Sequence, residues 1–307
     1  MEEKYLKSKM GHKSKKSLLY RLAGRISKIL RGYQQRQDEK LLIESERIWF
    51  DLFQNGDSFL FQLEKEVKIK LYKDSILSKL IYNGFEKKER DYVMSQLNNG
   101  DIFVDVGSNI GLFSLPASIK VGDTGRVICF EPAPTTFNRL LENININKFH
   151  NLDIRNLGLS DKQGELQFHL YNDGYDAWNS FAADKNLQSD VAISVRTSTL
   201  DHELSDIDKS RIKLIKIDVE GWEKFVLHGG KEFFTNYDPI VLIEFTDTNT
   251  FNAGYSIYEL YDIMINWGYT WYRLGENNEL EKETKQFRYP YVNLIAIKKY
   301  IRTLNSI

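Results

Sequence analysis

The residues best suited to chemistry begin with a glycine-containing loop that has a carboxylate at its start. The loop runs Asp105-Val106-Gly107-Ser108-Asn109-Ile110-Gly111. Its glycines allow a tight turn and a close approach of the backbone to a ligand, but the spacing is not the G-x-G-x-x-G that cradles a pyrophosphate. Because Asp105 repels an anion and attracts an amino group or a sulfonium, the loop favours the amino-acid end of S-adenosylmethionine. We expect Asp105, Gly107, Ser108, Asn109 and Gly111 to bind this cofactor.

A second carboxylate, Glu131, lies 20 residues after Gly111 and directly before Pro132. It follows the apolar run 127–130, which Pro132 would end as a strand. An acidic residue at this place accepts hydrogen bonds from both ribose hydroxyls of an adenosine, as in dinucleotide-binding folds. The loop and Glu131 together predict an adenosyl cofactor. The alternative, a nicotinamide-dependent oxidoreductase, is disfavoured because its glycine fingerprint is absent.

Charges in an otherwise apolar segment predict the reaction centre. Lys216, Asp218 and Glu220 alternate along 214–220, so they share one side of an extended strand. A strand of a parallel sheet seldom buries three charges without a function. We expect Asp218 to act as the base or to orient the acceptor, and Lys216 to pair with a carboxylate or to act as the base if burial lowers its pKa. Glu220 and Glu244, the latter at the end of the next apolar run, are expected to shape the site.

Two further chemistries stay open at these positions. Carboxylate oxygens are the ligands that Mg²⁺ prefers, but no ligand spacing in the sequence compels a metal, so none is predicted. His228 follows the charged segment, and a lone histidine in such a place is more often a packing or capping residue than a base.

The segment 173–181 mixes aromatic and polar side chains. Aromatic faces beside amide and hydroxyl groups suit a carbohydrate or another polyhydroxylated acceptor. We expect Trp178, Asn179 and Ser180 to bind the acceptor. The alternative is a surface loop whose aromatic side chains pack on the body of the protein.

Short apolar runs that alternate with helical patterns must position these residues. Strands are predicted near 102–106, 127–130, 152–157, 165–170, 191–195, 214–219, 240–245, 269–273 and 292–297. A helix is expected over 76–97, and a capping box at Ser256 and Glu259 begins another. This pattern predicts a buried parallel sheet with right-handed crossovers. We expect a basic helical extension at 1–55, a strand pair and helix at 56–100, and the core α/β domain at 101–300.

The composition bounds the class of protein. The 307 residues are 42% hydrophobic and 28% charged, which excludes a disordered chain. No apolar stretch approaches the roughly 18 residues of a membrane span, and the N-terminus lacks a signal-peptide pattern. The single cysteine, Cys129, excludes a disulfide framework and a cysteine-based zinc site. We therefore expect a cytoplasmic protein.

A basic arm contrasts with an acidic body. Residues 4–36 contain eleven Lys or Arg and no Asp or Glu, which leaves a net charge of −12 on the rest of the chain. Leu18, Leu22, Ile26 and Ile29 recur at helical spacing within the arm. Three partners are open: the body or a second subunit, an anionic membrane surface at the inner side of the membrane, and nucleic acid, which is the least favoured. The oligomeric state is not predicted.

Taken in order, the motifs resemble the FkbM-type family of S-adenosylmethionine-dependent methyltransferases over about half of the chain. The matching stretches are Tyr82-Asn83-Gly84-Phe85-Glu86, Asp105–Gly111, Phe130-Glu131-Pro132, Gly158-Leu159-Ser160-Asp161, Thr199-Leu200-Asp201, Lys216–Gly221 and Leu242-Ile243-Glu244. The resemblance implies a class I methyltransferase fold, with a mostly parallel seven-stranded sheet and an antiparallel last strand. It also adds Glu86, Ser160 and Asp161 to the expected cofactor site. Ser108 and Gly158 stand where the family usually has alanine, and we expect both changes to be mild.

The sequence therefore predicts an S-adenosylmethionine-dependent O-methyltransferase that acts on a sugar hydroxyl of a glycan or glycolipid. One alternative is a methyltransferase of small secondary metabolites, which the resemblance also allows. Another is a membrane-surface or nucleic-acid adaptor that uses the basic arm, with the α/β domain as a scaffold.

Overall fold

A computed structural model describes residues 44–54, 56–171, 179–182, 191–276 and 278–298. The chain falls into two compact units, with the division after Gly56. In the first unit, residues 44–52 form a helix, and the rings of Trp49 and Phe53 meet edge to face at 4.8 Å. The predicted helix in the basic arm, residues 4–36, lies outside the described residues. Among the described helices, none has both the length and the apolar composition that crossing a bilayer requires.

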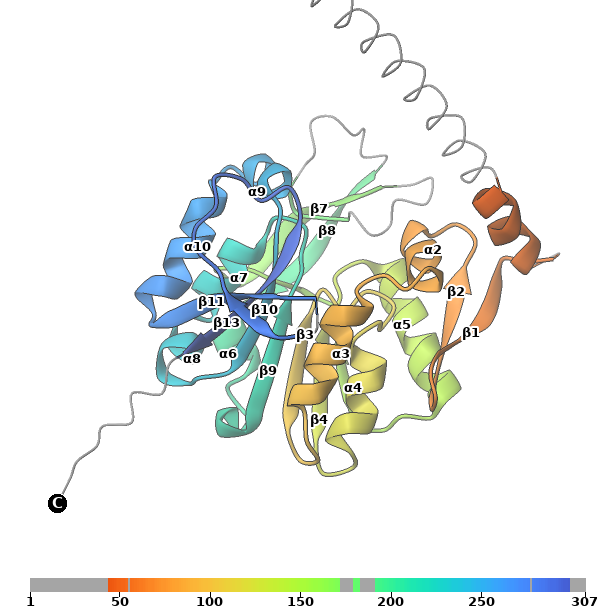
Figure 1. The fold of residues 1–307 in the computed structure, drawn as a ribbon, viewed down its shortest axis with the longest axis horizontal. Helices are drawn as coiled ribbons and strands as arrows, with labels where there is room; N and C mark the ends of the chain where they lie inside the picture. Colours follow the sequence, from red (N-terminus) through yellow and green to blue (C-terminus); the bar gives the residue numbers. More distant parts are fainter. Residues whose placement is uncertain (1–43, 55, 172–178, 183–190, 277, 299–307) are drawn as a thin grey trace, which may run out of the picture. The chain divides into compact units, whose positions relative to one another are not determined.

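The central sheet of the second unit has eight strands in the order β12-β11-β13-β10-β9-β3-β4-β5 (Figure 1). Its strands are β3 (Ile102–Val106), β4 (Arg126–Phe130), β5 (Leu152–Arg155), β9 (Ile212–Ile217), β10 (Ile240–Phe245), β11 (Tyr269–Leu274), β12 (Leu280–Lys282) and β13 (Val292–Lys298). Strands β5, β4, β3, β9 and β10 run parallel, and β13 is antiparallel to both of its neighbours. This confirms the predicted class I architecture, a mostly parallel sheet with an antiparallel last strand. The unpredicted eighth strand, β12, is short and exposed, so it carries no apolar signal.

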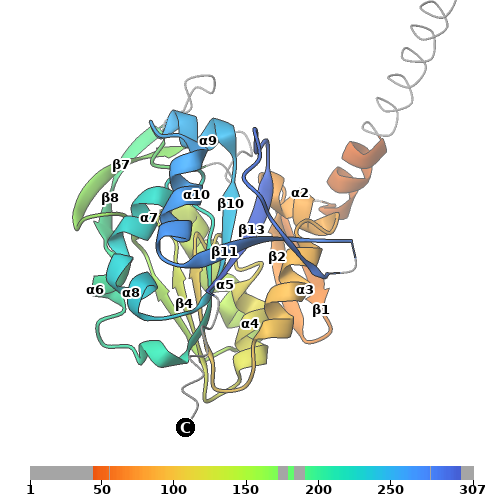
Figure 2. The ribbon, with the colours of Figure 1, turned by 60° about the vertical axis from the view of Figure 1, so that its left-hand side comes forward.

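Helices cover both faces of this sheet. They are α2 (Ile76–Tyr82), α3 (Lys87–Gln96), α4 (Ser114–Val121), α5 (Pro134–Asn147), α6 (Leu200–Glu203), α7 (Glu223–Gly229), α8 (Lys231–Asn236), α9 (Asp247–Asn252) and α10 (Ile257–Asn266). One face, which includes Val104, Ile215 and Ile243, packs on α7, α8 and α10 in a large apolar core. Helices α3 and α4 pack against the strands from the other side (Figure 2). Because side chains alternate along a strand, every second residue of β3 and β9 faces α3 and α4.

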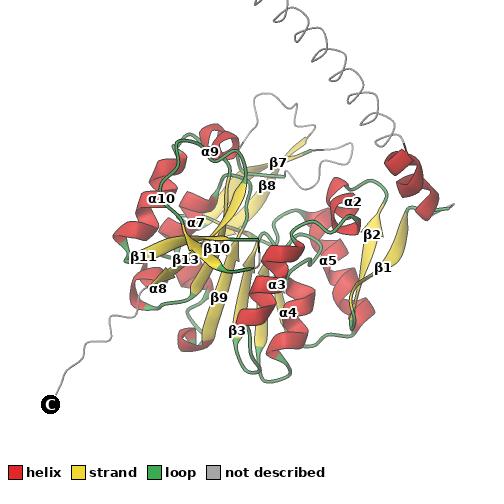
Figure 3. Cartoon of the chain, viewed as in Figure 1, coloured by secondary structure: helices red, strands yellow, loops and turns green. Residues whose placement is uncertain are grey.

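The segment 76–97 is not the continuous helix that its pattern predicts. It breaks between α2 and α3, where Gly84 has φ 84° and Glu86 has φ 50° (Figure 3). Glycine accepts this left-handed conformation at no steric cost, and the backbone turns sharply there. Consequently Glu86 lies at the start of α3 rather than on the side of a long helix.

Two smaller sheets flank the central one. The strands predicted at 165–170 and 191–195 are β7 (Gly164–Leu170) and β8 (Val191–Ser198). They belong to a separate three-stranded sheet, not to the parallel one, in which β8 pairs with both β7 and β6 (Gly158–Leu159). Along much of β7 and β8, exposed residues alternate with partly or fully buried ones, as expected for strands with one solvated face.

The predicted strand pair near the start of the second unit is also present, as β1 (Ser58–Glu64) and β2 (Val67–Tyr72). Its free edge is occupied by α5, because the side-chain oxygens of Asn147 and Asn143 accept hydrogen bonds from the backbone of Lys68 and Lys70 at 2.9 and 2.7 Å. These contacts anchor the segment that leads to α2 and Glu86.

Candidate active site

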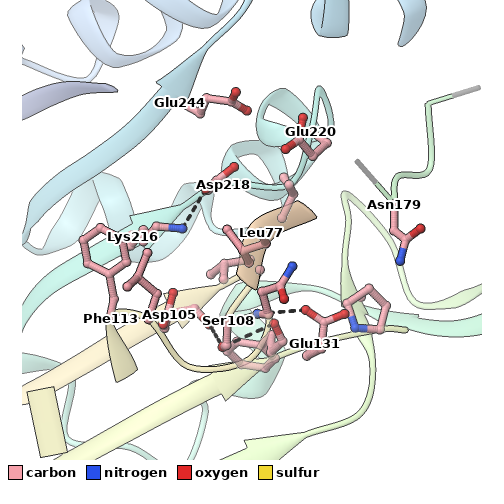
Figure 4. Close-up of a pocket in the computed structure, with 18 of the residues that line it drawn as sticks. Leu77, Asp105, Ser108, Phe113, Glu131, Asn179, Lys216, Asp218, Glu220 and Glu244 are labelled. Carbon is pink, nitrogen blue, oxygen red and sulfur yellow. Dashed lines mark hydrogen bonds and ion pairs between the residues drawn. The ribbon is translucent and has the colours of Figure 1, made fainter. Parts of the chain in front are cut away.

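A cavity of about 350 Å³ opens at the carboxyl ends of β3, β4, β9 and β10. Open α/β sheets bind their ligands at this edge. Figure 4 shows Asp218, Glu220 and Glu244 gathered above the loop that carries Asp105 and Ser108. The predicted site residues that line the cavity are Glu86, Asp105, Gly107, Ser108, Asn109, Glu131, Asn179, Lys216, Asp218, Glu220 and Glu244.

Four predicted site residues do not line the cavity, and one lies outside the described residues. The Gly111 backbone has φ 100°, and a Cβ there would lie 2.9 Å from Leu115, so this glycine serves packing against α4. Ser160 is buried and accepts a hydrogen bond from the indole of Trp222, while its neighbour Asp161 is exposed. Ser180 donates to the backbone carbonyl of Glu220 at 2.7 Å. Trp178 is the residue outside the described part of the chain, and His228 is exposed on α7.

Gly107 allows two strand ends to meet. Its backbone has φ 81°, and a Cβ at this position would lie 1.9 Å from the carbonyl oxygen of Asp218. The amide of Asp218 donates in turn to the carbonyl of Val106. The absence of a side chain at Gly107 therefore lets the end of β9 pack against the loop. It also leaves the loop backbone accessible to a ligand.

Asp105 is buried at the end of β3 with one carboxylate oxygen unsatisfied. Its Oδ2 accepts a hydrogen bond from the hydroxyl of Ser114, the first residue of α4. Its Oδ1 has no hydrogen-bond partner among the described residues, and neither has Oδ1 of Asn109. Burial raises the pKa of Asp105. Orphaned acceptors in a cavity wall require a ligand with N–H or O–H donors, and an adenosyl cofactor with an ammonium group and ribose hydroxyls fits this requirement.

Glu131 stands at the neighbouring strand end and anchors the loop. Its carboxylate accepts hydrogen bonds from the backbone amides of Asn109 (3.0 Å) and Ala133 (2.9 Å). A carboxylate has about four acceptor positions, and Glu131 lies in the cavity wall, where it can face the ribose of an adenosyl cofactor. The adjoining wall is apolar and aromatic, as an adenine ring requires; it consists of Phe130, Pro132, Leu157, Leu159, Phe168 and Phe181.

Gly158 lies against the ring of an aromatic residue in the cavity wall. A Cβ at Gly158 would lie 2.4 Å from the ring of Phe181. The ring of Phe181 packs edge to face on Phe168 at 4.8 Å. The glycine and the large ring therefore fit together, so the absence of a side chain at Gly158 leaves room for Phe181.

Lys216 and Asp105 are cross-strand partners on β9 and β3, so both side chains face α4. The Lys216 ammonium donates to Asp218 Oδ2 at 2.8 Å and lies 5.0 Å from the centre of the Phe113 ring. Burial alone would lower its pKa, but the neighbouring carboxylates outweigh burial and raise it above the ordinary value. Those carboxylates are Asp218, Asp105 and Glu86. Lys216 thus pairs with a carboxylate, which is the first of the two roles expected for it.

Glu86 joins the cavity from the break between α2 and α3. Its Oε1 accepts hydrogen bonds from the hydroxyl of Tyr291 (3.1 Å) and from the side-chain amide of Asn293 on β13. Burial, reinforced by the charge of Asp218, raises its pKa to about 7. The residue was assigned by resemblance alone, and only the turn at Gly84 explains how it reaches the sheet edge.

The turn between β9 and α7 carries Asp218 and Glu220, and the carboxylate of Glu223 stabilises this turn. Glu220 has φ 53°, and its carboxylate accepts a hydrogen bond from the side chain of Asn249 at 2.6 Å. The buried carboxylate of Glu223 accepts from the amides of Val219 and Gly221, each at 3.1 Å. Sequence reasoning missed Glu223, although its place at the first turn of α7 is a usual one for an acidic residue.

The carboxylate oxygens of Asp218, Glu220 and Glu244 lie within 4.8 Å of one another. Burial, followed by the charges of neighbouring carboxylates, raises the pKa of Glu220 and of Glu244 well above the ordinary range. Glu244 also accepts a hydrogen bond from the hydroxyl of Thr246 at 2.9 Å. At this spacing oxygen donors can hold a proton between them or bridge a divalent cation.

A family model described as the methyltransferase FkbM domain matches residues 105–270, more than half of the chain. The chain belongs to the FkbM methyltransferase family. Its cofactor is therefore S-adenosylmethionine, and the enzyme is a methyltransferase. The family match spans the glycine-containing loop, Glu131 and the turn after β9.

Relatives of this FkbM methyltransferase include an enzyme named as a 2-O-methyltransferase and one named as a hexuronic acid methyltransferase. The chain is 28% identical over 185 residues to a Sinorhizobium fredii protein named 2-O-methyltransferase NoeI, which covers 56% of this chain and 74% of that one. It is 29% identical over 139 residues to a Haloferax volcanii protein named hexuronic acid methyltransferase AglP, and this alignment covers 45% of this chain and 53% of that protein. The solved structure of methyltransferase FkbM from Methylobacillus flagellatus aligns with a TM-score of 0.41 and 13% identity, over 72% of this chain and 54% of that one.

Proposed function

We propose that this enzyme transfers a methyl group to a hydroxyl of a carbohydrate, in a glycan or a glycolipid. The observation that carries the proposal is the cluster of Asp218, Glu220 and Glu244 in the wall of the cofactor cavity. An alcohol must lose its proton as it gains a methyl group, so a positioned proton acceptor is needed. The similarity to AglP, a hexuronic acid methyltransferase, supports a sugar acceptor, and the similarity to NoeI, a 2-O-methyltransferase, supports transfer to an oxygen atom.

Asp218 is our candidate for the proton acceptor. S-adenosylmethionine supplies a methyl group already activated by a positively charged sulfur. Lys216 donates to Oδ2 of Asp218 and fixes the carboxylate, whose second oxygen can take the hydroxyl proton. Glu220 and Glu244, whose pKa values are raised by burial and by neighbouring carboxylates, lie beside Asp218 and can orient the acceptor by hydrogen bonds.

Positioning is the larger contribution in this scheme. Alignment of two reactants contributes up to about 7–11 kcal/mol, whereas a positioned base contributes about 10²–10⁴-fold in rate. The cavity wall beyond the carboxylates offers amide and hydroxyl groups together with an aromatic ring, which suit a polyhydroxylated acceptor. These groups belong to Asn179, Thr246, Asn249 and Tyr291.

The proposal can be tested with methyl-labelled S-adenosylmethionine and two sets of acceptors, glycans and hydroxylated metabolites without sugar. We expect label to enter the glycans, with a mass gain of one CH₂ unit. Asp218→Asn should abolish transfer while its affinity for S-adenosylhomocysteine stays within a few-fold of wild type. Asp262→Asn, which removes a surface ion pair with Lys285, is the matched control. Transfer only to non-sugar acceptors, or full activity of Asp218→Asn, would contradict the proposal.

We also propose that the basic arm contacts an anionic membrane surface. Its eleven cations and the helical spacing of its apolar residues support this partner. Removal of residues 1–36 should abolish co-sedimentation with phosphatidylserine vesicles and leave methylation of a soluble acceptor intact. Failure of the full chain to co-sediment with these vesicles even at low salt would contradict the proposal.

A further inference from the structure

A second cavity, of about 410 Å³, adjoins the active-site cavity and is more open to solvent. Its charged lining residues are two arginines, Arg273 and Arg288, and one carboxylate, Glu283. We call it the arginine groove. Tyr291 lines both cavities, so they meet at this side chain. The active-site cavity has many carboxylates and a single lysine in its wall, whereas cations outnumber carboxylates in the wall of the groove.

The strand order places the groove beyond the reaction centre (Figure 1). The glycine-containing loop follows β3 and Glu131 follows β4, whereas Arg273 belongs to β11, on the other side of β9 and β10. Val292, the first residue of β13, pairs with Phe245, the last residue of β10, so the groove lies at the ligand-binding edge of the sheet. An acceptor whose hydroxyl reaches Asp218 can therefore extend away from the cofactor and into the groove.

Arg288 is the less engaged of the two cations. Its side chain is 79% exposed, and its Nε lies 3.9 Å from Oδ2 of Asp247, which is beyond hydrogen-bond distance. That oxygen already accepts a hydrogen bond from the amide of Tyr289 at 2.8 Å. Arg273, by contrast, donates to the carboxylate of Glu283 at 3.0 Å. Because a guanidinium has five N–H donors, Arg288 retains capacity for an anion.

The backbone that carries Arg288 is held in place on both sides of this residue. The hydroxyl of Tyr258 on α10 donates to the carbonyl of Phe287 at 2.7 Å. The amide of Asp247 donates to the carbonyl of Tyr289 at 2.8 Å, and the amide of Tyr289 donates to the side chain of Asp247. Since a loop that is already ordered loses little conformational freedom on binding, an arginine on it can contribute to affinity.

We propose that the arginine groove binds an anionic group of the acceptor, with Arg288 as the donor. The group is a carboxylate or a phosphate on a sugar that neighbours the methylated one. A guanidinium binds either group through two parallel hydrogen bonds. The groove also keeps this negative charge away from the carboxylates around Asp218, which would repel it. The inference rests on the proposed function, and it narrows the acceptor from glycans in general to acidic glycans.

The competing explanation is that Arg288 is a solvated surface cation. In that case neither the charge of Arg288 nor the charge of the glycan affects the reaction. Under the proposal, removal of either charge breaks the same contact. The two effects should therefore fail to add when both charges are removed.

Methyl transfer by the full chain can separate these explanations. The acceptors are glycans divided by anion exchange into a neutral and an acidic fraction, and we expect label from methyl-labelled S-adenosylmethionine in the acidic one. Removal of the anionic groups should raise the apparent KM about three- to tenfold and leave kcat unchanged. Reduction with carbodiimide and borohydride removes carboxylates, and alkaline phosphatase removes phosphate monoesters, so the effective treatment identifies the anion. Arg288→Gln should raise the KM of the untreated fraction by the same factor and make it insensitive to the treatment.

Arg126→Gln is the matched control, because Arg126 is a partly exposed arginine at the start of β4, at the opposite edge of the sheet. It should keep the wild-type KM for treated and untreated glycans. Label in neutral glycans alone, or an equal KM of wild type and Arg288→Gln for the acidic fraction, would overturn the inference and leave the proposed function intact. Absence of label from both glycan fractions would contradict the proposed function, and the inference would fall with it.

Discussion

Substitution of Gly107 by alanine should damage both stability and cofactor binding, because a Cβ has no room there. Gly107 and Gly268 both have left-handed backbones, with φ 81° and 88°. A Cβ at Gly107 would lie 1.9 Å from the Asp218 carbonyl oxygen, whereas nothing lies within 4 Å of one at Gly268. Gly268→Ala therefore measures the backbone cost alone, about 1–2 kcal/mol for a non-glycine residue in this conformation.

The clash at Gly107 adds to this cost. Forcing an atom into a packed region typically costs about 1–3 kcal/mol more, so Gly107→Ala should lose about 2–5 kcal/mol. For a domain of this size, 1 kcal/mol corresponds to about 2–4 °C in Tm. We expect losses of about 2–8 °C for Gly268→Ala and about 4–20 °C for Gly107→Ala, measured by thermal unfolding followed by circular dichroism.

Cofactor affinity provides the second measurement. Relief of the clash must move the loop or the Asp218 carbonyl, so Gly107→Ala should bind S-adenosylhomocysteine at least about tenfold more weakly, while Gly268→Ala should bind it as wild type does. Equal Tm values for the two variants, together with an unchanged affinity, would refute the reasoning. This result would show that the end of β9 can move away from the loop without loss of stability or of cofactor affinity.

Three further outcomes are expected. Glu131→Ala should weaken S-adenosylhomocysteine binding at least about tenfold, measured by calorimetry. The control Glu165→Ala, at an exposed position of β7, should bind as wild type does. Equal affinities of the two variants would show that Glu131 does not bind the ribose. Glu223→Ala should cost about 2–4 kcal/mol in urea unfolding because buried amides lose their acceptor. Glu223→Gln should cost less since an amide oxygen still accepts, and an identical cost would show that charge matters more than acceptance. Finally, the pKa of Glu86 is raised to about 7 in the folded protein, against an ordinary value of 4.5 that applies to the unfolded chain. Between these two pH values the folded state binds more protons than the unfolded state, so the free energy of unfolding should fall as pH rises from 4.5 to about 7. Glu86→Gln should flatten the decline, and an equally steep decline in that variant would contradict the raised pKa.

Local sequence patterns were sufficient to predict the parallel strands and the functional residues at their carboxyl ends. The parallel strands and the capping box at Ser256 and Glu259 are present as predicted. Asp105 and Glu131 line the same cavity because consecutive parallel strands end at the same edge. Such relations follow from alternation and connectivity, which are local properties of a sequence.

Side chains that support the cavity wall without lining it were harder to predict. Ser180 was expected to bind the acceptor, yet it supports the carbonyl of Glu220. Glu223 looked like an ordinary acidic residue of a first helical turn, yet it is buried against two backbone amides. In both cases the partner is a backbone group whose position depends on a left-handed turn at Glu220, which no periodicity reveals.

The sequence by itself determined the fold class, the edge of the sheet where ligands bind, and the type of cofactor, since each depends on apolar periodicity or on charge at a strand end. Only the tertiary structure decided which charges meet. Asp105 and Lys216 are 111 positions apart in the chain, and their partnership depends on the register between β3 and β9. The protonation of Lys216 is likewise a tertiary property, because it depends on the balance between burial and the carboxylates that three separate segments bring around it.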